Sequence, residues 1–347
     1  MRFGLIGVGA VGRIRGTALA ALPGSTLSAV HDLNLAAAKE LAGGARVFDS
    51  VESLFASDAC DAVIISTPPN SHERLAIGAL ENGKHVLVEK PMANSLESCQ
   101  RMLEASRRAG LVLTVGFNQR YFDAVKVLRD AVRSGAIGRL SYVRGFAGHT
   151  GLSEFGAPWM HDKDVMGGGA LMDNGIHMLD LVRHIMGEVE SVYGVIKDDI
   201  WNLDRSEDNA FALFRGRDGV VGSLNASWSE WKGYQTYIEA YGDKGMARAY
   251  YAPMTSTVIT MDRPGGIPRV KRDFYVSAIV REKLRGWQST TVRTFLQEFT
   301  DFIELTKNRE GGGVIAQGID GYRSIEIANA IYRASETGQP VTLSPTV

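Results

Sequence analysis

Residues 1–32 read MRFGLIGVGAVGRIRGTALAALPGSTLSAVHD, and this stretch decides the fold of the first part of the chain. Apolar residues over positions 3–8 predict a strand, the glycines among and after them predict a turn into a helix, and residues 27–30 predict a second strand that leads to Asp32. A strand, a glycine-rich turn, a helix and a further strand indicate a parallel, doubly wound α/β sheet.

The turn has the G-x-G-x-x-G spacing of a dinucleotide-binding loop. Gly7 allows the tight turn, Gly9 lets a pyrophosphate approach the backbone, and Gly12 lets the helix pack closely on the sheet. Asp32 stands 20 residues after Gly12, where an acidic side chain meets the 2′-hydroxyl of an adenosine ribose. The expected coenzyme contacts of the loop are Gly7, Gly9, Ala10, Val11 and Gly12.

Asp32 also discriminates between coenzymes. A carboxylate accepts hydrogen bonds from ribose hydroxyls but repels the 2′-phosphate of NADP, so NAD is the expected cofactor. Arg13 and Arg15 follow the glycine loop and supply compensating positive charge, which keeps NADP as the alternative.

Length and charge set the broad class. A chain of 347 residues exceeds the size at which one core usually keeps growing, so two domains are expected. The 38 Lys and Arg residues nearly balance the 39 Asp and Glu residues, and no basic run is interleaved with aromatic residues. A small neutral molecule is therefore favoured as partner over nucleic acid or a membrane.

Cysteine usage and the N-terminus favour the cytoplasm. Cys60 and Cys99 are too few for a disulfide framework or a zinc cluster, so no metal site is expected. No segment approaches the ~18 apolar residues of a membrane span, and the first residues already belong to the predicted strand, which leaves no room for a signal peptide.

Strands and helices keep alternating over residues 1–120, which predicts one nucleotide-binding domain. The apolar run at 61–66 predicts a central strand, and the prolines after it force a turn at the carboxyl edge of the sheet, where such sheets bind ligands. The expected coenzyme contacts of this turn are Ser66, Thr67, Pro68, Asn70 and His72. For His72 the alternative is a polar residue in the first turn of the next helix.

The strand at 85–88 ends in Glu89-Lys90-Pro91. Proline disfavours helix in the residue before it, so Lys90 is expected to be extended at the same edge of the sheet. A lysine there is usually a solvated charge, but beside a nicotinamide it can donate a hydrogen bond to a substrate oxygen. Glu89, Lys90 and Asn118, which follows the last strand, complete the expected coenzyme contacts.

Beyond residue 120 the pattern changes, and we expect an α+β domain over residues 121–347. Successive strands without crossovers predict an antiparallel or mixed sheet. The strand-like runs lie at 140–146, 189–196, 210–214, 220–228, 237–241 and 257–261. Trp228, at the end of one run, is interpreted as part of a packed sheet face or a subunit contact.

A glycine-rich segment, GGGALMDNGIHMLD at 167–180, interrupts these strands. Its apolar residues have helical periodicity, which places Asp173 and His177 on one face. The carboxylate can orient the imidazole and stabilise its charged form, although an ordinary surface pair is the commoner meaning of this spacing. Gly175 favours a functional pair over a surface pair. A glycine inside a helix costs about 1 kcal/mol and needs a reason, such as close approach to a ligand or another backbone.

These motifs together carry a family resemblance. In their order and across nearly the whole chain they resemble the glucose-fructose oxidoreductase, inositol dehydrogenase and rhizopine-catabolism (Gfo/Idh/MocA) family. The motifs are the glycine loop with Asp32, STPPNSH at 66–72, EKP at 89–91, GFN at 116–118, the 167–180 segment and YGDKG at 241–245.

The resemblance implies an N-terminal Rossmann domain and a C-terminal α+β domain with a large, open, mostly antiparallel sheet that binds substrate and forms homodimers or homotetramers. It also implies that Lys90, Asp173 and His177 are catalytic. Many members have arginine where this chain has Met160, and residues 254–287 resemble the family least. We expect the latter to be a loop over the site or an oligomer arm.

The expected reaction is hydride transfer between the nicotinamide and a secondary hydroxyl of a sugar, glycoside or cyclic polyol. His177 is expected to be the general base, Asp173 to orient it, and Lys90 to hydrogen-bond the reacting oxygen. The expected substrate contacts are Lys90, Arg120, Trp159, Asp173 and His177. The alternatives are a non-catalytic NAD-sensing regulator on the same fold, and transient oxidation that leads to elimination or hydrolysis of a glycoside.

Overall fold

The computed structural model describes residues 1–151, 157–309 and 311–345, which fall into two compact units. The first unit consists of Met1–Tyr121 and Arg281–Tyr322, and the second of Phe122–Val280 and the chain from Arg323 onward. The expected second domain, 121–347, differs from this division because residues 281–322 pack with the first unit. Helices α9 (Val276–Arg285) and α11 (Gly318–Thr337) each begin in one unit and end in the other.

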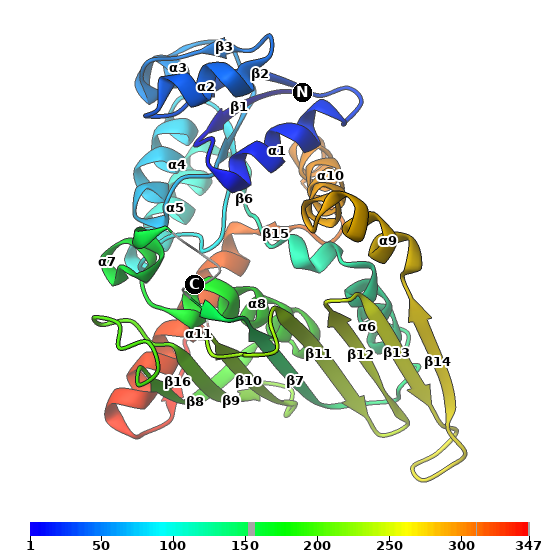
Figure 1. Cartoon of the computed structure of the whole chain (residues 1–347). Helices are drawn as coiled ribbons and strands as arrows, with labels where there is room; N and C mark the ends of the chain where they lie inside the picture. The colour runs from blue at the N-terminus through cyan, green and yellow to red at the C-terminus, as the bar shows by residue number, and fades with distance from the viewer. Residues whose placement is uncertain (152–156, 310, 346–347) are drawn as a thin grey trace. The chain divides into compact units, whose positions relative to one another are not determined.

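The first unit is built on a seven-stranded sheet of described residues, in the order β15-β6-β5-β4-β1-β2-β3 (Figure 1). Every pair is parallel except β15 with β6, so the predicted doubly wound sheet is confirmed. The strands are β1 (Arg2–Ile6), β2 (Thr26–His31), β3 (Arg46–Val47), β4 (Ala62–Ile65), β5 (His85–Val88), β6 (Leu113–Val115) and β15 (Ala316–Gln317). The helices are α1 (Ala10–Ala20), α2 (Leu35–Ala42), α3 (Val51–Ala56), η1 (Pro69–Ser71), α4 (His72–Glu81), α5 (Leu96–Ala109), η2 (Asn118–Tyr121) and α10 (Gln288–Lys307).

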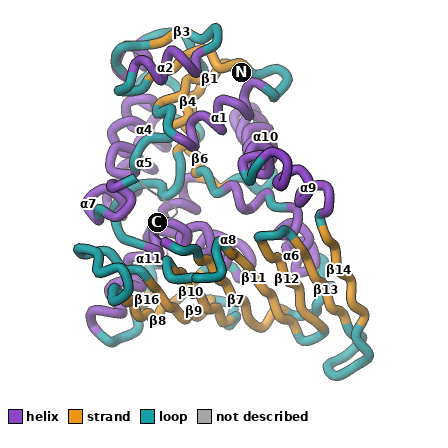
Figure 2. The backbone as a smooth tube through the Cα atoms, viewed as in Figure 1, coloured by secondary structure: helices purple, strands orange, loops and turns teal. Residues whose placement is uncertain are grey.

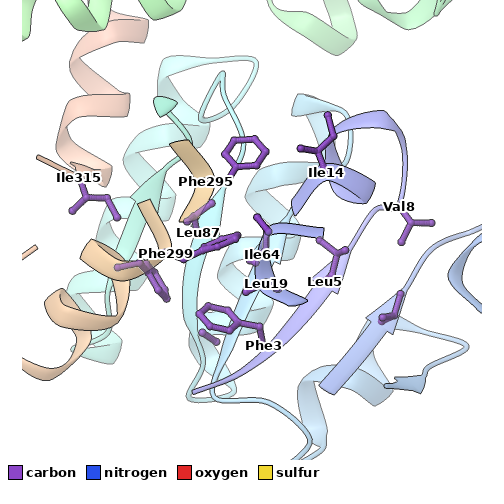
Figure 3. Packing of buried hydrophobic residues seen from close by; sticks show 14 of the residues in the cluster. Phe3, Leu5, Val8, Ile14, Leu19, Ile64, Leu87, Phe295, Phe299 and Ile315 are labelled. Atoms are coloured by element: carbon purple, nitrogen blue, oxygen red, sulfur yellow. The ribbon is translucent and has the colours of Figure 1, made fainter. Parts of the chain in front are cut away.

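Helix α10 explains why residues 281–322 belong to the first unit. Its phenylalanines pack with α1 on the sheet face that presents Phe3 of β1 (Figure 3). The Phe3 ring lies 5.7 Å from the ring of Phe299 and 5.9 Å from that of Phe302, between centroids. Burying a phenylalanine contributes roughly 1.5–3 kcal/mol, so the core of this unit depends on a helix almost 300 residues downstream of β1.

The second unit contains a nine-stranded sheet of described residues, in the order β14-β13-β12-β11-β7-β10-β9-β8-β16 (Figure 2). Only β7 and β10 pair in parallel, so the mostly antiparallel sheet is confirmed. The strands are β7 (Leu140–Gly148), β8 (Val189–Lys197), β9 (Asn209–Gly216), β10 (Val221–Ser227), β11 (Gln235–Gly242), β12 (Gly245–Tyr251), β13 (Thr255–Thr260), β14 (Arg269–Phe274) and β16 (Val341–Thr342). The helices are α6 (Asp123–Arg133), η4 (Pro158–His161), α7 (Lys163–Met166), η5 (Leu171–Gly175) and α8 (Ile176–Met186).

The two faces of this sheet differ. Helix α8 lies against one face, where Gly145 of β7 leaves room for it: a Cβ there would lie 2.6 Å from the Cγ of Met178. The opposite face presents exposed apolar side chains from neighbouring strands. They are Tyr142, Tyr193, Val195, Phe211, Leu213 and Val221.

Residues 254–287 form two strands at one edge of the sheet, followed by a helix. The segment contains β13, β14 and the whole of α9, so the expectation of a loop is wrong, because β13 pairs with β12 and β14 pairs with β13. Ile267, Phe274 and Leu284 are more than half exposed, and an oligomer arm stays a prediction. In the described part of the chain, no helix is both long enough and apolar enough to cross a membrane.

Candidate active site

The glycine loop shows why each glycine is there. Gly7 has a φ of +89°, and a Cβ on Gly12 would lie 2.0 Å from the carbonyl oxygen of Gly7. These two glycines are required by the turn and by helix packing. A Cβ on Gly9 would meet no described atom within 4 Å, and Gly9, Ala10 and Val11 are exposed. Gly9, the N-cap residue of α1, has no side chain to cap the helix, and the first N–H groups of α1 therefore suit an anion such as a pyrophosphate.

Asp32 is held beside this loop. Its Oδ2 accepts a hydrogen bond from the Val8 N–H (2.7 Å), and its Oδ1 accepts one from the Asn34 N–H (2.7 Å). The half-buried carboxylate is thereby fixed at the end of β2, as recognition of a ribose requires. Arg13 is paired with Glu40 (2.8 Å) and Arg15 is fully buried, so the two cations that supported the NADP alternative are engaged elsewhere.

The turn after β4 places its predicted residues differently. Ser66, Thr67 and Pro68 are half-buried and Asn70 is exposed, whereas His72 is completely buried. The His72 ring nitrogens lie 2.8 Å from the Thr67 carbonyl oxygen and 3.1 Å from that of Pro91, and burial lowers the pKa of the imidazole. The buried ring therefore lies between two turns of the first unit at the start of α4, and contact of His72 with the coenzyme stays a prediction.

The EKP triplet lies at the end of β5. Lys90 is half-buried and is joined to Pro91 by a cis peptide bond, and Glu89 is buried against Arg15, whose Nε donates to its Oε1 (2.7 Å). Asn118 donates to the Thr294 hydroxyl (3.0 Å).

Arg120, an expected substrate contact, is buried in η2. Only 4% of it is exposed, and its Nη1 donates to the Val314 carbonyl (3.2 Å) and lies 3.5 Å from the Asp320 carboxylate. Both of these partners lie in the first unit, and contact of Arg120 with substrate stays a prediction.

In the second unit Asp173 receives two hydrogen bonds on one oxygen. Its Oδ2 accepts from the Nε2 of His149 (3.1 Å) and from the indole N–H of Trp228 (3.1 Å). The Nδ1 of His149 accepts from the Gly151 N–H (2.9 Å), so a neutral ring carries its proton on Nε2, facing the carboxylate. All three side chains are buried. Two N–H donors stabilise the ionised carboxylate and fix its orientation.

The backbone around Asp173 departs from a regular α-helix. Asp173 lies in the π-helical turn η5, and the buried His177 lies in the first turn of α8. A π-helical turn is wider than an α-helical one, so the predicted i, i+4 geometry does not apply unchanged. The reason for Gly175 is packing on β10, since a Cβ there would lie 2.8 Å from the Cβ of Ala226.

Glu207 holds the beginning of the same segment. Its Oε2 accepts from the Gly169 N–H (2.9 Å), and its Oε1 accepts from the Leu171 N–H (2.8 Å) and the Tyr332 hydroxyl (3.1 Å). A Cβ on Gly169 would lie 1.9 Å from the backbone oxygen of Glu207, which explains this glycine. Burial raises the pKa of the Glu207 carboxyl. Asp173 and His177, the catalytic candidates, therefore come just after a stretch of backbone that the buried Glu207 carboxylate holds in place.

Sequence reasoning missed His149 and Glu207, and it missed the hydrogen bond of Trp228. No spacing in the sequence connects them with Asp173, because the pairing of β7, β9 and β10 brings them together. Trp159 lies in η4 and is 38% exposed. Among the described residues, no group of three or more His, Cys, Asp or Glu side chains could hold a metal ion.

Comparison with known proteins agrees with both units. The profile described as "Oxidoreductase family, NAD-binding Rossmann fold" matches residues 1–117, and the profile described as "GFO/IDH/MocA C-terminal domain" matches residues 125–248. The chain belongs to the Gfo/Idh/MocA oxidoreductase family. The family resemblance and NAD as cofactor are thereby confirmed, and the exposed start of α1 together with the fixed Asp32 fits this coenzyme.

Several relatives of this Gfo/Idh/MocA protein are named for an enzymatic activity. It is 30% identical to the myo-inositol 2-dehydrogenase of Thermotoga maritima, over 100% of both chains. It is 27% identical to the levoglucosan dehydrogenase of Pseudarthrobacter phenanthrenivorans, over 96% of each. Among solved structures, it is similar to a levoglucosan dehydrogenase in complex with NADH and levoglucosan, with a TM-score of 0.87, 25% identity and 100% coverage of both chains. It is also similar to the WlbA dehydrogenase of Bordetella pertussis in complex with NADH and UDP-GlcNAcA, with a TM-score of 0.81, 27% identity and coverage of 100% and 98%.

Proposed function

We propose that this protein transfers a hydride between NAD and a secondary hydroxyl of a sugar, glycoside or cyclic polyol. The observation that carries the proposal is the full-length likeness to an enzyme named for myo-inositol, supported by the likeness to a solved enzyme with NADH and levoglucosan. Both of those compounds are small cyclic molecules with several hydroxyl groups. A substrate of this class also agrees with the nearly neutral composition of the chain.

Each proposed catalytic residue has a defined task. His177 takes the hydroxyl proton as general base. Asp173 orients the His177 ring and stabilises the imidazolium that forms. Asp173 suits this task because the N–H groups of His149 and Trp228 already fix its Oδ2. Lys90 donates a hydrogen bond to the reacting oxygen. Acid–base catalysis of this kind contributes typically about 10²–10⁴-fold to the rate.

The coenzyme, when bound, accepts the hydride from the carbon that bears the hydroxyl. The N–H groups at the start of α1 hold its pyrophosphate, and Asp32 binds the adenosine ribose. The other proposed coenzyme contacts lie in the turn after β4 and at the ends of β5 and β6. They are Ser66, Thr67, Pro68, Asn70, Glu89, Lys90 and Asn118. Trp159 offers an exposed ring face to a sugar.

The test combines a substrate panel with two variants. Inositols, hexoses and glycosides are assayed for reduction of NAD and NADP, and Lys90→Ala and His177→Ala are compared with Lys39→Ala, which removes an exposed lysine of α2. We expect both active-site variants to lose at least about 10²-fold in kcat while NADH binding stays largely intact.

Wild-type turnover in Lys90→Ala and His177→Ala would reject these roles. Absence of turnover with every compound, despite NADH binding, would favour the NAD-sensing regulator. A changed glycoside without net NADH would favour transient oxidation.

The exposed apolar face of the second sheet supports a homo-oligomer. Phe211 and Leu213 of β9 are 47% and 57% exposed, and neighbouring strands add further apolar side chains. We propose that copies of the chain pair through this face as dimers or tetramers. Phe211→Asp with Leu213→Asp should lower the mass measured by sedimentation, and a monomeric wild-type protein would refute the proposal.

The location of the protein in the cytoplasm stays a prediction.

A further inference from the structure

The first unit contains a fully buried arginine between two carboxylates. The Nε of Arg15 donates to Glu89 (2.7 Å), its Nη2 lies 2.6 Å from the same oxygen, and its Nη1 donates to Glu298 of α10. Its guanidinium carbon lies 3.6 Å from the centre of the Phe295 ring. Burial of such charges is costly, so this Arg15–Glu89–Glu298 cluster is poor evidence for stability alone and calls for another reason.

The cluster reaches Lys90 through Glu89. The Oε2 of Glu89 accepts the backbone N–H of Lys90 (3.3 Å), while its Oε1 is bound by Arg15. The two oxygens of one carboxylate thus connect the guanidinium to the residue proposed to bind the reacting oxygen. A rotation of Glu89 that broke one contact would also disturb the other.

The surroundings leave space for this ion pair and little else. Gly116 follows β6, and a Cβ there would lie 2.6 Å from the Nη2 of Arg15 and 3.0 Å from the Oε2 of Glu89. The glycine of the GFN motif is therefore explained by the cluster. The same ion pair ties α1, whose N-terminus forms the anion site, to the end of β5. Arg15 stands in α1 three residues after Gly12.

We propose that Arg15 is a positioning residue that acts through Glu89 to hold Lys90 in its working orientation and to couple Lys90 to the coenzyme-binding helix α1. The inference rests on the proposed role of Lys90. It differs from a purely structural role, in which loss of Arg15 would lower thermal stability and leave the Lys90 side chain where it is.

The experiment compares Arg15→Met with Arg13→Met, which removes the exposed, ion-paired arginine of the same helix. The readouts are kcat, the Kd for NADH, the Tm and the NMR signal of Lys90 after reductive ¹³C-methylation, assigned with Lys90→Arg. We expect Arg15→Met to lower kcat by about tenfold to a hundredfold and to shift the Lys90 signal, because small misplacements of a reacting group have effects of this size. Arg13→Met should do neither.

Two further variants keep the test decisive. If Arg15→Met does not fold, Glu89→Gln takes its place, since it keeps the shape and weakens the contact with Arg15, and the same shift of the Lys90 signal is expected. An unshifted Lys90 signal with wild-type kcat in the folded variant overturns the proposal. If Lys90→Ala itself keeps wild-type turnover, the proposed function fails, and the NMR signal still decides whether Arg15 positions Lys90.

Discussion

Replacing Glu207 tests whether the anchor of the glycine-rich segment sets the activity. Glu207→Ala removes the acceptors of two buried backbone N–H groups, those of Gly169 and Leu171. An unsatisfied buried donor costs about 1–3 kcal/mol, so we expect a loss of roughly 2–6 kcal/mol. Glu207→Gln keeps one acceptor oxygen and turns an NH₂ group toward one of the two donors, so about half of that loss is expected.

In Glu207→Ala, kcat should fall by more than the loss of folded protein can explain. At roughly 2–4 °C per kcal/mol, the Tm of Glu207→Ala should decrease by at least about 4 °C. Because Asp173 and His177 follow this anchor, a displacement near 1 Å would lower kcat by up to about 10²-fold, even well below the Tm. The Kd for NADH should not change, since the proposed NAD contacts lie in the first unit.

The assays are thermal denaturation, steady-state kinetics and titration with NADH. Tyr332→Phe is the matched control, because it removes only the hydroxyl that donates to Glu207 and should cost about 1 kcal/mol. Wild-type kcat in a folded Glu207→Ala variant, measured at 25 °C, would refute the argument that Glu207 fixes the catalytic segment.

Three other predictions follow from the contacts above. Gly9→Ala should keep the wild-type Tm and weaken NADH binding, because a Cβ there meets no described atom, whereas Gly12→Ala should lower the Tm by several degrees; equal effects would contradict the loop analysis. Trp228→Phe removes one N–H donor from Asp173 and should lower kcat by about tenfold at unchanged NADH affinity, and an unaltered kcat would speak against the proposed role of Asp173. Burial raises the pKa of Glu298 from 4.5 to about 7, so the folded protein binds this proton more tightly than the unfolded chain does. The stabilising contribution of Glu298 is complete below pH 4.5 and is lost as the pH rises through about 7, a change of roughly 3 kcal/mol in the free energy of unfolding. Urea unfolding at several pH values measures this change, and it should be absent in Glu298→Gln.

The first sheet could be predicted because its signals are local. The glycine loop, Asp32 and the proline turn after β4 each lie within a few residues of the strand they end, so spacing alone indicated their position. The same local reasoning proposed the two catalytic candidates of the second unit, Asp173 and His177, and their roles stay a prediction. The spacing of the loop glycines likewise predicts a separate task for each of them.

The remaining features depend on contacts between distant residues. His149 and Trp228 meet Asp173 because β7 and β10 pair in register, and a sequence shows neither partner nor register of a strand. His72 was predicted as a coenzyme contact because it follows the turn at the carboxyl edge of the sheet, and the structure adds that backbone carbonyls from two separate turns lie beside its buried ring. Gly175 was expected to approach a ligand or a backbone, and the structure gives a strand as its neighbour.

The return of α10 to the first unit affects how the protein folds as it is made. The nascent chain leaves the ribosome from its N-terminus, so β1 emerges long before Phe295, Phe299 and Phe302 exist to cover it. Until then α1 alone covers this part of the sheet face, and the apolar surface that α10 will bury is left to solvent and to chaperones, since contacts of such long sequence separation form slowly. A fragment that stops at residue 121 would keep every motif of the loop and lack the aromatic cover that completes its core.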